Sequence, residues 1–564
     1  MSTTQIPVLI VGGGIVGLTA SLFLSSHGVQ SLLVERHAGT SVHPRARGLN
    51  RRTMELYRGL GIDEQVRAAG APLAPAGGIY QGSSLAAVIE THTRKERTGP
   101  RRLPLADYFT YLGPVEGTRG TQDMIEPVLM SAARERGGEV MMNTECISVE
   151  QDAYRVVATI RDRISQIEST VHATYLIAAD GAGSPTRQRL GIQTTGAGKL
   201  GFLLSILFHA DLSELVRGRE FSMCLVTQQM VKGLFTSINN HDVWVFHLSY
   251  DPDKEAAADF SPERCERLLK LALGLSDVEI DIKSILPWEP TVRVAEKFQH
   301  GRVFLAGDSA HQMPPWGGQG ATTGIADVHN LAWKLAAVLS GRANPALLET
   351  YDSERLPIGR LVSAESGAAS DVDGLISLKI TIPSVLALIR RLPRLPGYGY
   401  VYASGAIVTE DTTPLLWKMI RLLPTVTQIL GIGGSAGSRA PHIWVKLGVQ
   451  EISTIDLFTK NFTILAGAAG DEWTKAAPKV SSCLDVEITA YRVGCGRELE
   501  APDGQWESAA GISSTGAILV RPDGFVAWSS WSTPPNIQEK LEEVLKTALC
   551  RRDFMSNVKS CVGG

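Results

Sequence analysis

The sequence predicts an α/β fold, and three observations carry this prediction. Residues 6–11 form a short continuous apolar run, as a parallel strand covered on both faces does. This run leads into the Gly-x-Gly-x-x-Gly turn at 12–17, then a helical pattern, then a second apolar run that ends at Glu35. Farther along the chain, the apolar runs at 175–179 and 303–306 end in Asp-Gly and Gly-Asp pairs. Strands that alternate with helices and end in glycine turns indicate a Rossmann-like sheet.

Length and composition limit the possible classes. The chain has 564 residues, and at roughly 150 residues per domain this favours several domains. Hydrophobic residues make up 44% and charged residues 20%, which is typical of a folded globule and not of a disordered chain. The formal net charge is only −3, so no large field attracts nucleic acid or anionic lipid. We expect no nucleic-acid partner.

The distribution of cysteines and apolar segments indicates where in the cell the protein is found. The seven cysteines are scattered and form no C-x-x-C motif, so neither a disulfide framework nor a cysteine metal site is indicated. No segment reaches the ~18 uninterrupted apolar residues of a membrane span, and the N-terminus has no basic signal-peptide region. The best apolar stretch, 375–389, contains Lys379 and Pro383. We therefore expect a cytoplasmic protein with no metal and no integral membrane span.

The N-terminal glycines predict a nucleotide site. Gly12 permits the tight turn, Gly14 lets the backbone approach a pyrophosphate, and Gly17 lets the helix pack close to the strand. The helix N-terminus favours phosphate. Glu35 follows Gly17 by 18 residues, where an acid can accept the hydroxyls of a ribose. Because strand, spacing and acid agree, we interpret the turn as a nucleotide-binding fingerprint and not as a simple connection.

A second glycine-rich loop lies far from the first in sequence. Gly307-Asp308 is followed by the loop 314–320 and by an amphipathic pattern over 325–335. Backbone amides at the start of that helix would suit an anionic or electron-rich ligand edge. Asp180-Gly181 leads in the same way into a short helix that Ser184 caps.

Other segments leave alternatives open. The arginines at 45, 47, 51 and 52 could form a solvated charge run or clamp a phosphate or a planar cofactor edge. The block 186–294 alternates in strand fashion and predicts an antiparallel sheet. In it, Trp244, His247 and Tyr250 are weak pocket candidates because parity lets only one alternating set face a ligand. Amphipathic helical runs in 371–430 could lie on a membrane, but packing between domains or in a homodimer is the commoner outcome.

These motifs, in this order and spacing, resemble the flavoprotein aromatic hydroxylases. The members of this family are single-component FAD-dependent monooxygenases of the para-hydroxybenzoate, phenol and polyketide hydroxylase type. The resemblance rests on the 12–17 turn with Glu35, on Asp180-Gly181, and on Gly307-Asp308 with its Pro-Pro-x-Gly-Gly-Gln-Gly sequel. The C-terminal part resembles the thioredoxin-like domain of the phenol and polyketide hydroxylases. Since Cys483 and Cys495 are twelve positions apart, we expect no redox function there.

The resemblance implies a cofactor site and a domain division. The 12–17 glycines and Glu35 would bind the ADP half of FAD, Asp308 the ribityl or pyrophosphate region, and 317–320 would lie beside the isoalloxazine. Asp180 would serve both FAD and NADPH. The full set of implied cofactor-binding residues is Gly12, Gly14, Gly17, Glu35, Arg36, Arg45, Arg47, Gln122, Asp180, Gly307, Asp308, Pro315, Gly317, Gly318, Gly320, Ala321 and Thr322. The implied domains are an FAD-binding domain at 1–185 and 295–370 with a substrate-domain insertion at about 71–103, a substrate sheet at 186–294, a helical link at 371–430 and a thioredoxin-like domain at 431–564.

Two departures from the family pattern concern the second loop. Thr322 stands where the family has asparagine, and Ser309 replaces the first alanine of the Gly-Asp-Ala-Ala-His stretch. A threonine hydroxyl has one donor where an amide has two. We therefore expect the flavin to be positioned differently at residue 322.

The resemblance also implies a reaction. NADPH or NADH would reduce FAD, and the reduced flavin would take up O2 as a C4a-hydroperoxide that hydroxylates a phenolic or aromatic polyketide substrate. No side chain need act as a nucleophile, so we assign no catalytic residue, although a pocket His or Tyr could accept a phenol proton. Baeyer–Villiger insertion and epoxidation of a polyketide remain alternatives, and a flavin-free scaffold protein is a third. Halogenation is disfavoured because the chain lacks Trp-x-Trp-x-Ile-Pro.

Overall fold

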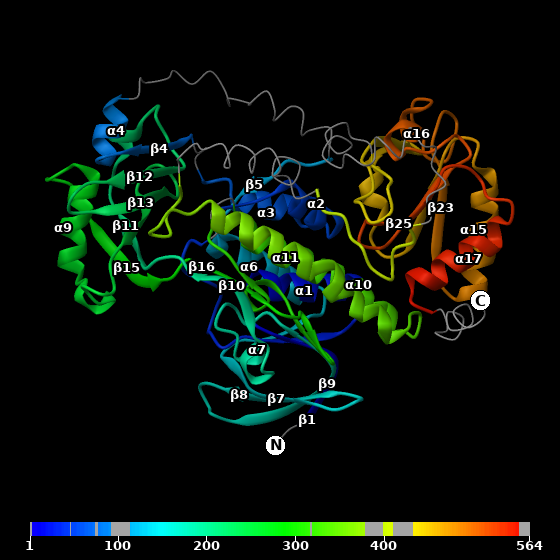
Figure 1. Cartoon of the computed structure of the whole chain (residues 1–564), viewed down its shortest axis with the longest axis horizontal. Coiled ribbons are helices and arrows are strands. Elements are labelled where there is room, and N and C mark those ends of the chain that lie inside the picture. Colours follow the sequence, from blue (N-terminus) through cyan, green and yellow to red (C-terminus); the bar gives the residue numbers. More distant parts are fainter. Residues whose placement is uncertain are drawn as a thin grey trace, which may run out of the picture.

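The computed structural model describes residues 3–45, 47–73, 77–91, 113–315, 318–377, 399–409 and 433–551. A central α/β domain lies between an antiparallel sheet on one side and the C-terminal domain on the other (Figure 1). Most of the segment that the sequence predicts as a helical link, 371–430, lies outside the described residues, as does part of the predicted insertion at 71–103. No helix within the described ranges is long and apolar enough to cross a membrane.

The central sheet is mainly parallel. Its strand order is β17-β18-β9-β1-β2-β6, and the pairs β18–β9, β9–β1, β1–β2 and β2–β6 all run parallel. β7 and β8 extend the sheet beside β9 as an antiparallel hairpin. The strands are β1 (Thr3–Val11), β2 (Ser31–Val34), β6 (Glu139–Met141), β7 (Thr144–Gln151), β8 (Val156–Asp162), β9 (Glu168–Ala178), β17 (Gln299–His300) and β18 (Val303–Leu305).

Two central helices pack closely against each other and against the sheet. Helix α1 (Ile15–Ser26) is buried from Gly17 to Leu24, so it belongs to the core rather than to the surface. Helix α10 (Gln319–Leu339) approaches α1 at Gly324, where an added Cβ would lie 2.6 Å from a methyl of Val16. Glycine at this position is therefore required for the close approach of the two helices. Helices α2 (Arg51–Gly59), α3 (Asp63–Ala69), α6 (Gln122–Glu135) and α11 (Thr350–Ala368) complete the cover.

The second sheet is antiparallel except at one edge. Its order is β15-β11-β14-β13-β12-β4, and only β4 runs parallel to its neighbour. Helices α4 (Leu85–Thr91) and α9 (Pro262–Leu273) cover its outer face (Figure 1). The strands are β4 (Ile79–Gly82), β11 (Leu203–His209), β12 (Met223–Thr227), β13 (Lys232–Ser237), β14 (Val243–Ser249) and β15 (Asp281–Trp288). The antiparallel sheet predicted from alternation is thus present, and it takes one strand from the segment 71–103.

A small three-stranded sheet joins the two larger ones, with β10 (Thr194–Lys199), β16 (Thr291–Ala295) and β19 (His311–Gln312) in the order β10-β16-β19.

The C-terminal domain has a mixed four-stranded sheet. Its order is β23-β22-β24-β25, with β22 and β23 parallel and the other pairs antiparallel. The rings of Trp473 and Trp528 meet in its core, 5.7 Å apart between centroids. The elements are β22 (Phe462–Ala466), α15 (Asp471–Leu484), β23 (Ile488–Arg492), α16 (Gln505–Ala510), β24 (Ala517–Val520), β25 (Val526–Ser530) and α17 (Ile537–Ala548).

Buried ion pairs attach this domain to the central helices. Arg521 donates to both carboxylate oxygens of Glu354 on α11, at 2.6 and 2.9 Å. Lys334 of α10 donates to the same carboxylate at 2.8 Å, and Asn330 bridges it to Asp523. All three charged side chains, Arg521, Glu354 and Lys334, are fully buried. Because an unpaired buried charge is very costly, these pairs fix the position of the domain.

Candidate cofactor site

Four strand ends meet at one edge of the central sheet. Val11 pairs in register with Val34 and with Ala178, and Ala178 pairs with Leu305. The next residues along the chain are Gly12, Glu35, Ala179 and Ala306, which directly precede or begin the predicted motifs. Open α/β sheets bind ligands outside the carboxyl ends of their strands. The structure therefore brings three segments that are far apart in sequence to one candidate binding edge.

The packing of the protein requires glycine at two positions of the first turn but not at the third. Gly12 has φ +110°, and a Cβ there would lie 2.2 Å from the Ala179 carbonyl oxygen. A Cβ on Gly17 would lie 1.9 Å from the Gly12 carbonyl oxygen. Gly14 has φ −75°, and its nearest foreign atom would be a Glu126 oxygen at 3.5 Å. The protein's own packing thus demands Gly12 and Gly17 but leaves Gly14 open, as a close approach by a pyrophosphate requires.

Glu35 closes the turn from the second strand. One of its carboxylate oxygens accepts from the Gly13 amide at 2.6 Å, and the other accepts from the His37 amide at 2.9 Å. The His37 ring nitrogen Nδ1 lies 2.5 Å from that second oxygen. Since a carboxylate offers about four acceptor positions, one remains for a ligand hydroxyl. This geometry fits the ribose contact that the sequence predicts.

Glu126 is a site residue that sequence reasoning missed. Its Oε1 accepts from the Ile15 amide at 3.1 Å and from the Gln122 side chain at 2.5 Å, and its Oε2 accepts from the Ser41 amide at 2.7 Å. Burial raises the pKa of Glu126, and these hydrogen bonds offset part of that rise. The carboxyl group therefore ties α6 to the first turn of α1 and to the loop after Glu35. Its position one helical turn after Gln122 was the available signal.

The Gly307 turn is held from behind by a buried carboxylate. Gly307 has φ +63°, and its amide donates to Oδ2 of Asp327 at 3.1 Å. The same oxygen lies 2.8 Å from Nε2 of His311, and Oδ1 of Asp327 accepts from Arg355 at 2.8 Å. Asp308, by contrast, is exposed at the edge. Asp327 was also missed from the sequence, and its buried contacts leave Asp308 available for a ligand.

Asp180 serves a local purpose in the structure. Its carboxylate accepts from the Ser184 hydroxyl at 2.5 Å and from the Thr186 amide at 3.0 Å, which caps α7 (Pro185–Arg189). Arg187 on that helix donates to the Ser309 carbonyl at 2.7 Å. The Asp-Gly and Gly-Asp motifs are thus joined directly through Arg187, while a contact of Asp180 with FAD or NADPH stays a prediction.

The second glycine loop leads into α10 as the sequence indicates. Gly318 has φ +65° and precedes the helix, and its amide donates to the Pro315 carbonyl at 2.9 Å. A Cβ on Gly320 would meet only a Met313 atom at 4.0 Å, so this position is open, and Ala321 beside it is half-buried. Gly317 lies outside the described residues.

The hydroxyl of Thr322 is used within the helix. It donates to the Gln319 carbonyl at 3.1 Å. A side chain committed to its own helix backbone has no second donor for a ligand. Thr322 therefore lacks a second donor of the kind that asparagine has, and its effect on the position of the flavin stays a prediction.

The predicted arginines separate into two groups. Arg36 and Arg45 are exposed, and the Arg45 carbonyl accepts from the Gln122 amide at 2.7 Å. Arg47 instead donates to the carbonyl and hydroxyl oxygens of Ser222, at 2.8 and 3.0 Å, in the loop before β12. Burial and the nearby Arg119 lower the pKa of Arg47 to about 10. Arg47 therefore joins the central domain to the antiparallel sheet.

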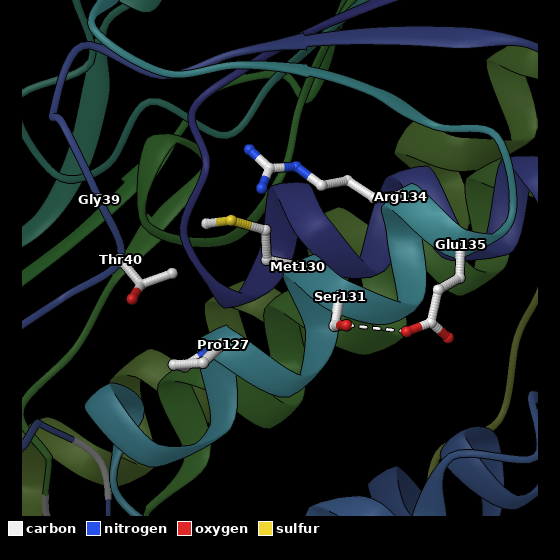
Figure 2. A pocket seen from close by; sticks show the side chains of 7 residues that line it. All are labelled: Gly39, Thr40, Pro127, Met130, Ser131, Arg134 and Glu135. Carbon is white, nitrogen blue, oxygen red and sulfur yellow. Dashed lines mark hydrogen bonds between the residues drawn. The ribbon is translucent and has the colours of Figure 1, made fainter.

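A surface hollow of about 380 Å³ borders helix α6 (Figure 2). It lies between the loop after Glu35 and helix α6. Met130 and Arg134 extend from α6 on one side, and Ser131 donates to Glu135 at 2.8 Å on the other. The lining residues are Gly39, Thr40, Pro127, Met130, Ser131, Arg134 and Glu135.

The sheet edge, with its two glycine turns and the acid after β2, defines a dinucleotide-binding protein of Rossmann type. Two family models match the chain: "FAD binding domain" over residues 5–366 and "Aromatic-ring hydroxylase, C-terminal" over residues 434–551. The chain therefore belongs to the FAD-binding aromatic-ring hydroxylases, and it is an FAD-dependent monooxygenase. The family resemblance inferred from the sequence is confirmed.

Known relatives match along the whole chain. The tetracenomycin A2 monooxygenase-dioxygenase of Streptomyces glaucescens is 38% identical over 573 residues, covering 98% of each chain. The 4-methyl-5-nitrocatechol 5-monooxygenase of a Burkholderia species is 37% identical over 567 residues, covering 97% of this chain and 98% of the relative. A solved aklavinone-11 hydroxylase, in ternary complex with FAD and aklavinone, is similar with a TM-score of 0.82 and 34% identity, covering 98% of this chain and 100% of the other.

Proposed function

We propose that the protein hydroxylates a phenolic or aromatic polyketide-type substrate, with NADPH or NADH as the reductant and O2 as the oxidant. The observation that carries the proposal is the convergence of the 12–17 turn, Glu35 and Gly307-Asp308 at one sheet edge. Relatives named for tetracenomycin A2 and aklavinone match the chain from end to end, which supports a polyketide over a small benzoate. No observation favours the Baeyer–Villiger or epoxidation alternatives.

The chain's own residues would bind and orient FAD. Gly12, Gly14, Gly17 and Glu35 would hold the ADP half, with Arg36 and Arg45 near its phosphates. Gln122 and Asp308 would hold the ribityl and pyrophosphate region. The loop Pro315, Gly317, Gly318, Gly320 and Ala321 would lie beside the isoalloxazine. When bound, FAD supplies the activation of O2 and the transfer of one oxygen atom to the ring.

Water exclusion is a second task of the protein. The sheet opposite the cofactor edge has an apolar inner face that carries Leu203, Leu225 and Leu234. An apolar roof of this kind suits a large aromatic ligand and keeps water from the reacting atoms.

We further propose the domain division given by the sequence, with a thioredoxin-like C-terminal domain at 431–564. The order β22-α15-β23-α16-β24-β25-α17 and the sheet order β23-β22-β24-β25 support a thioredoxin-like arrangement. Cys483 and Cys495 are free, which supports a structural and not a redox role. A cytoplasmic location and a homodimer belong to the same proposal. The six described cysteines form no disulfide, which is compatible with a reducing compartment.

Mass spectrometry of products tests the proposed reaction. FAD-loaded protein would be incubated in air with NADPH or NADH and with aklavinone, tetracenomycin A2, 4-methyl-5-nitrocatechol or phenol. We expect a gain of one oxygen with the ring retained from a polyketide. A ring-expanded lactone would assign Baeyer–Villiger chemistry instead. Hydrogen peroxide alone from every compound would contradict the substrate class, and failure to retain FAD would contradict the cofactor site.

A further inference from the structure

The two faces of the antiparallel sheet have different surroundings. On β14, Trp244, Phe246 and Leu248 point into the core formed with α4 and α9. Because side chains alternate along a strand, His247 points to the opposite face. On that face Leu203, Leu225 and Leu234 pack with Leu375, which follows α11 of the central domain. His247 is therefore the member of the three sequence candidates that faces the central domain, whereas Tyr250 packs beside Phe260 at the outer core.

One cross-strand row on the inner face contains His247 among largely apolar residues. Strand register places His247 opposite Ser205 on β11 and opposite Leu234 on β13. The row continues to Leu286 on β15 and to Leu225 on β12. The Ser205 hydroxyl lies 2.9 Å from Nδ1 of His247. The Trp288 ring lies 5.6 Å from the imidazole, between centroids. The ring is thus held at Nδ1, and its Nε2 can bind a ligand on the inner face of the sheet.

The central domain brings positive charge to this ring. Burial, with smaller contributions in the same direction from the nearby His43 and Arg47, lowers the pKa of His247 to about 4. Arg47 is fixed there by its two bonds to Ser222. Both ring nitrogens of His43 are buried and have no hydrogen-bond partner within the described part of the chain. Arg119 lies near Arg47, and Arg45 and Asp123 lie near His43. At neutral pH the neutral imidazoles therefore lie in a region of net positive charge, which suits a ligand oxygen that carries partial negative charge.

We propose that His247, held by Ser205, accepts the hydrogen bond of an aromatic hydroxyl on the substrate and makes the enzyme selective for phenolic rings. The inference rests on the proposed function and names the substrate group that this site recognises. With Nδ1–H donating to Ser205, the lone pair of Nε2 is directed to the inner face. The hydroxyl keeps its proton, and its polarised O–H bond raises electron density on the ring. The Arg47 charge stabilises that oxygen as its negative charge grows.

Sequence reasoning could not choose this residue. Parity shows that Trp244 and His247 lie on opposite faces, but only the position of α4 and α9 shows which face is covered. A hydrogen bond between a substrate hydroxyl and this acceptor also discriminates between substrates more strongly than apolar contact does, because a substrate without the hydroxyl leaves the acceptor unpaired. His247 is thus a specificity-determining residue with a testable partner on the ligand.

The experiment compares two probes that differ by one hydroxyl, 2-hydroxyanthraquinone and anthraquinone. Their affinities for the FAD-loaded, oxidised enzyme are measured from the change in flavin absorbance, in mildly acidic buffer where the hydroxyl is protonated. We expect wild type to prefer the hydroxylated probe about tenfold, the effect of one net hydrogen bond of about 1.4 kcal/mol. His247→Leu removes the preference. His247→Gln retains part of it because the amide oxygen accepts, and Ser205→Ala lowers it by releasing the ring.

The matched control is His241→Leu, because this ring lies on the turn before the same strand with 62% of its side chain exposed. It should keep the wild-type preference and flavin content. A folded, FAD-loaded His247→Leu enzyme that still prefers the hydroxylated probe would overturn the inference. Equal wild-type affinity for the two probes would also overturn it while leaving the proposed function intact. Wild-type binding of neither probe would contradict the polyketide class, and the inference with it.

Discussion

Asp327→Asn removes a buried negative charge on which three groups depend. Its carboxylate lies 2.8 Å from both His311 Nε2 and Arg355 Nε, and it accepts from the Gly307 amide at 3.1 Å. Asp327 and Arg355 are 0% and 1% exposed in their side chains. An asparagine leaves the guanidinium of Arg355 without its carboxylate, and loss of one member of a buried pair costs about 3–5 kcal/mol. This is a large part of the ~5–15 kcal/mol that stabilises a typical domain.

The assay measures both folding and cofactor binding. Thermal unfolding is followed in the FAD-loaded enzyme, and the FAD dissociation constant is measured by flavin fluorescence. We expect a lower unfolding temperature and weaker FAD binding, since the Gly307 turn loses its support. The control is Asp371→Asn, which breaks a half-exposed ion pair with Lys232 and should cost less than ~1 kcal/mol. Equal unfolding temperatures and FAD affinities in the two variants would refute the reasoning.

The pH dependence of this effect has a definite sign. Burial alone would raise the pKa of Asp327, but the Arg355 charge and the His311 contact outweigh it and hold the pKa below its ordinary value. The carboxylate therefore stabilises the fold fully above the ordinary aspartate pKa of about 3.9, and this stabilisation is lost as the pH falls through the native pKa. The difference between wild type and Asp327→Asn should persist at neutral pH and narrow only in acid.

Three further predictions concern other parts of the molecule. Gly14→Val should fold but retain little flavin by visible absorbance, whereas Gly12→Val should fail to fold because its Cβ meets a backbone oxygen at 2.2 Å; normal flavin content in Gly14→Val would contradict the site. Glu354→Gln should lower the urea midpoint by the equivalent of about 3–5 kcal/mol, because it leaves the buried Lys334 without its carboxylate partner and Arg521 with Asp523 alone, and an unchanged midpoint would exclude this role. Burial lowers the pKa of His442 to about 4, so the stabilisation by its neutral ring is complete above about pH 6.5 and is lost as the pH falls toward 4. Between these two pH values, His442→Gln should reduce the slope of the unfolding free energy against pH by up to ~1.4 kcal/mol per pH unit. The same slope in wild type and variant would contradict this role of His442.

The sequence predicts those parts of the site whose conformation depends on residues close together in the chain. The need for glycine at 17 comes from its contact with the Gly12 carbonyl within one strand-turn-helix unit, and Gly12 itself takes a φ of +110° in that turn, so spacing alone indicates both. Glu126 lies 111 positions from the Ile15 amide that it binds. Asp327 supports Gly307 only because α10 folds back over the turn. Such long-range partners depend on packing that no local pattern encodes.

Arg47 illustrates the same limit. The sequence left a solvated charge run and a cofactor clamp as alternatives for this residue. Its guanidinium binds Ser222, 175 positions away in the loop before β12, and a contact with the cofactor stays a prediction. The antiparallel sheet, by contrast, follows from alternation along each strand, a property visible in any short window. The sequence predicts which side chains of a strand share a face of this sheet, but it does not predict which face α4 and α9 cover.

The ion pair between Arg521 and Glu354 links the C-terminal domain to the helices behind the Gly307 turn. Helices α10 and α11, which carry Asp327 and Arg355 behind the Gly307 turn, are the same helices that carry Lys334 and Glu354. A chain truncated before residue 433 would lose Arg521, which donates to both carboxylate oxygens of Glu354, and this loss would weaken the packing of both helices. The boundary between the central and C-terminal domains is therefore a poor site for truncation or domain exchange, because the central helices depend on an ion pair that the C-terminal domain supplies.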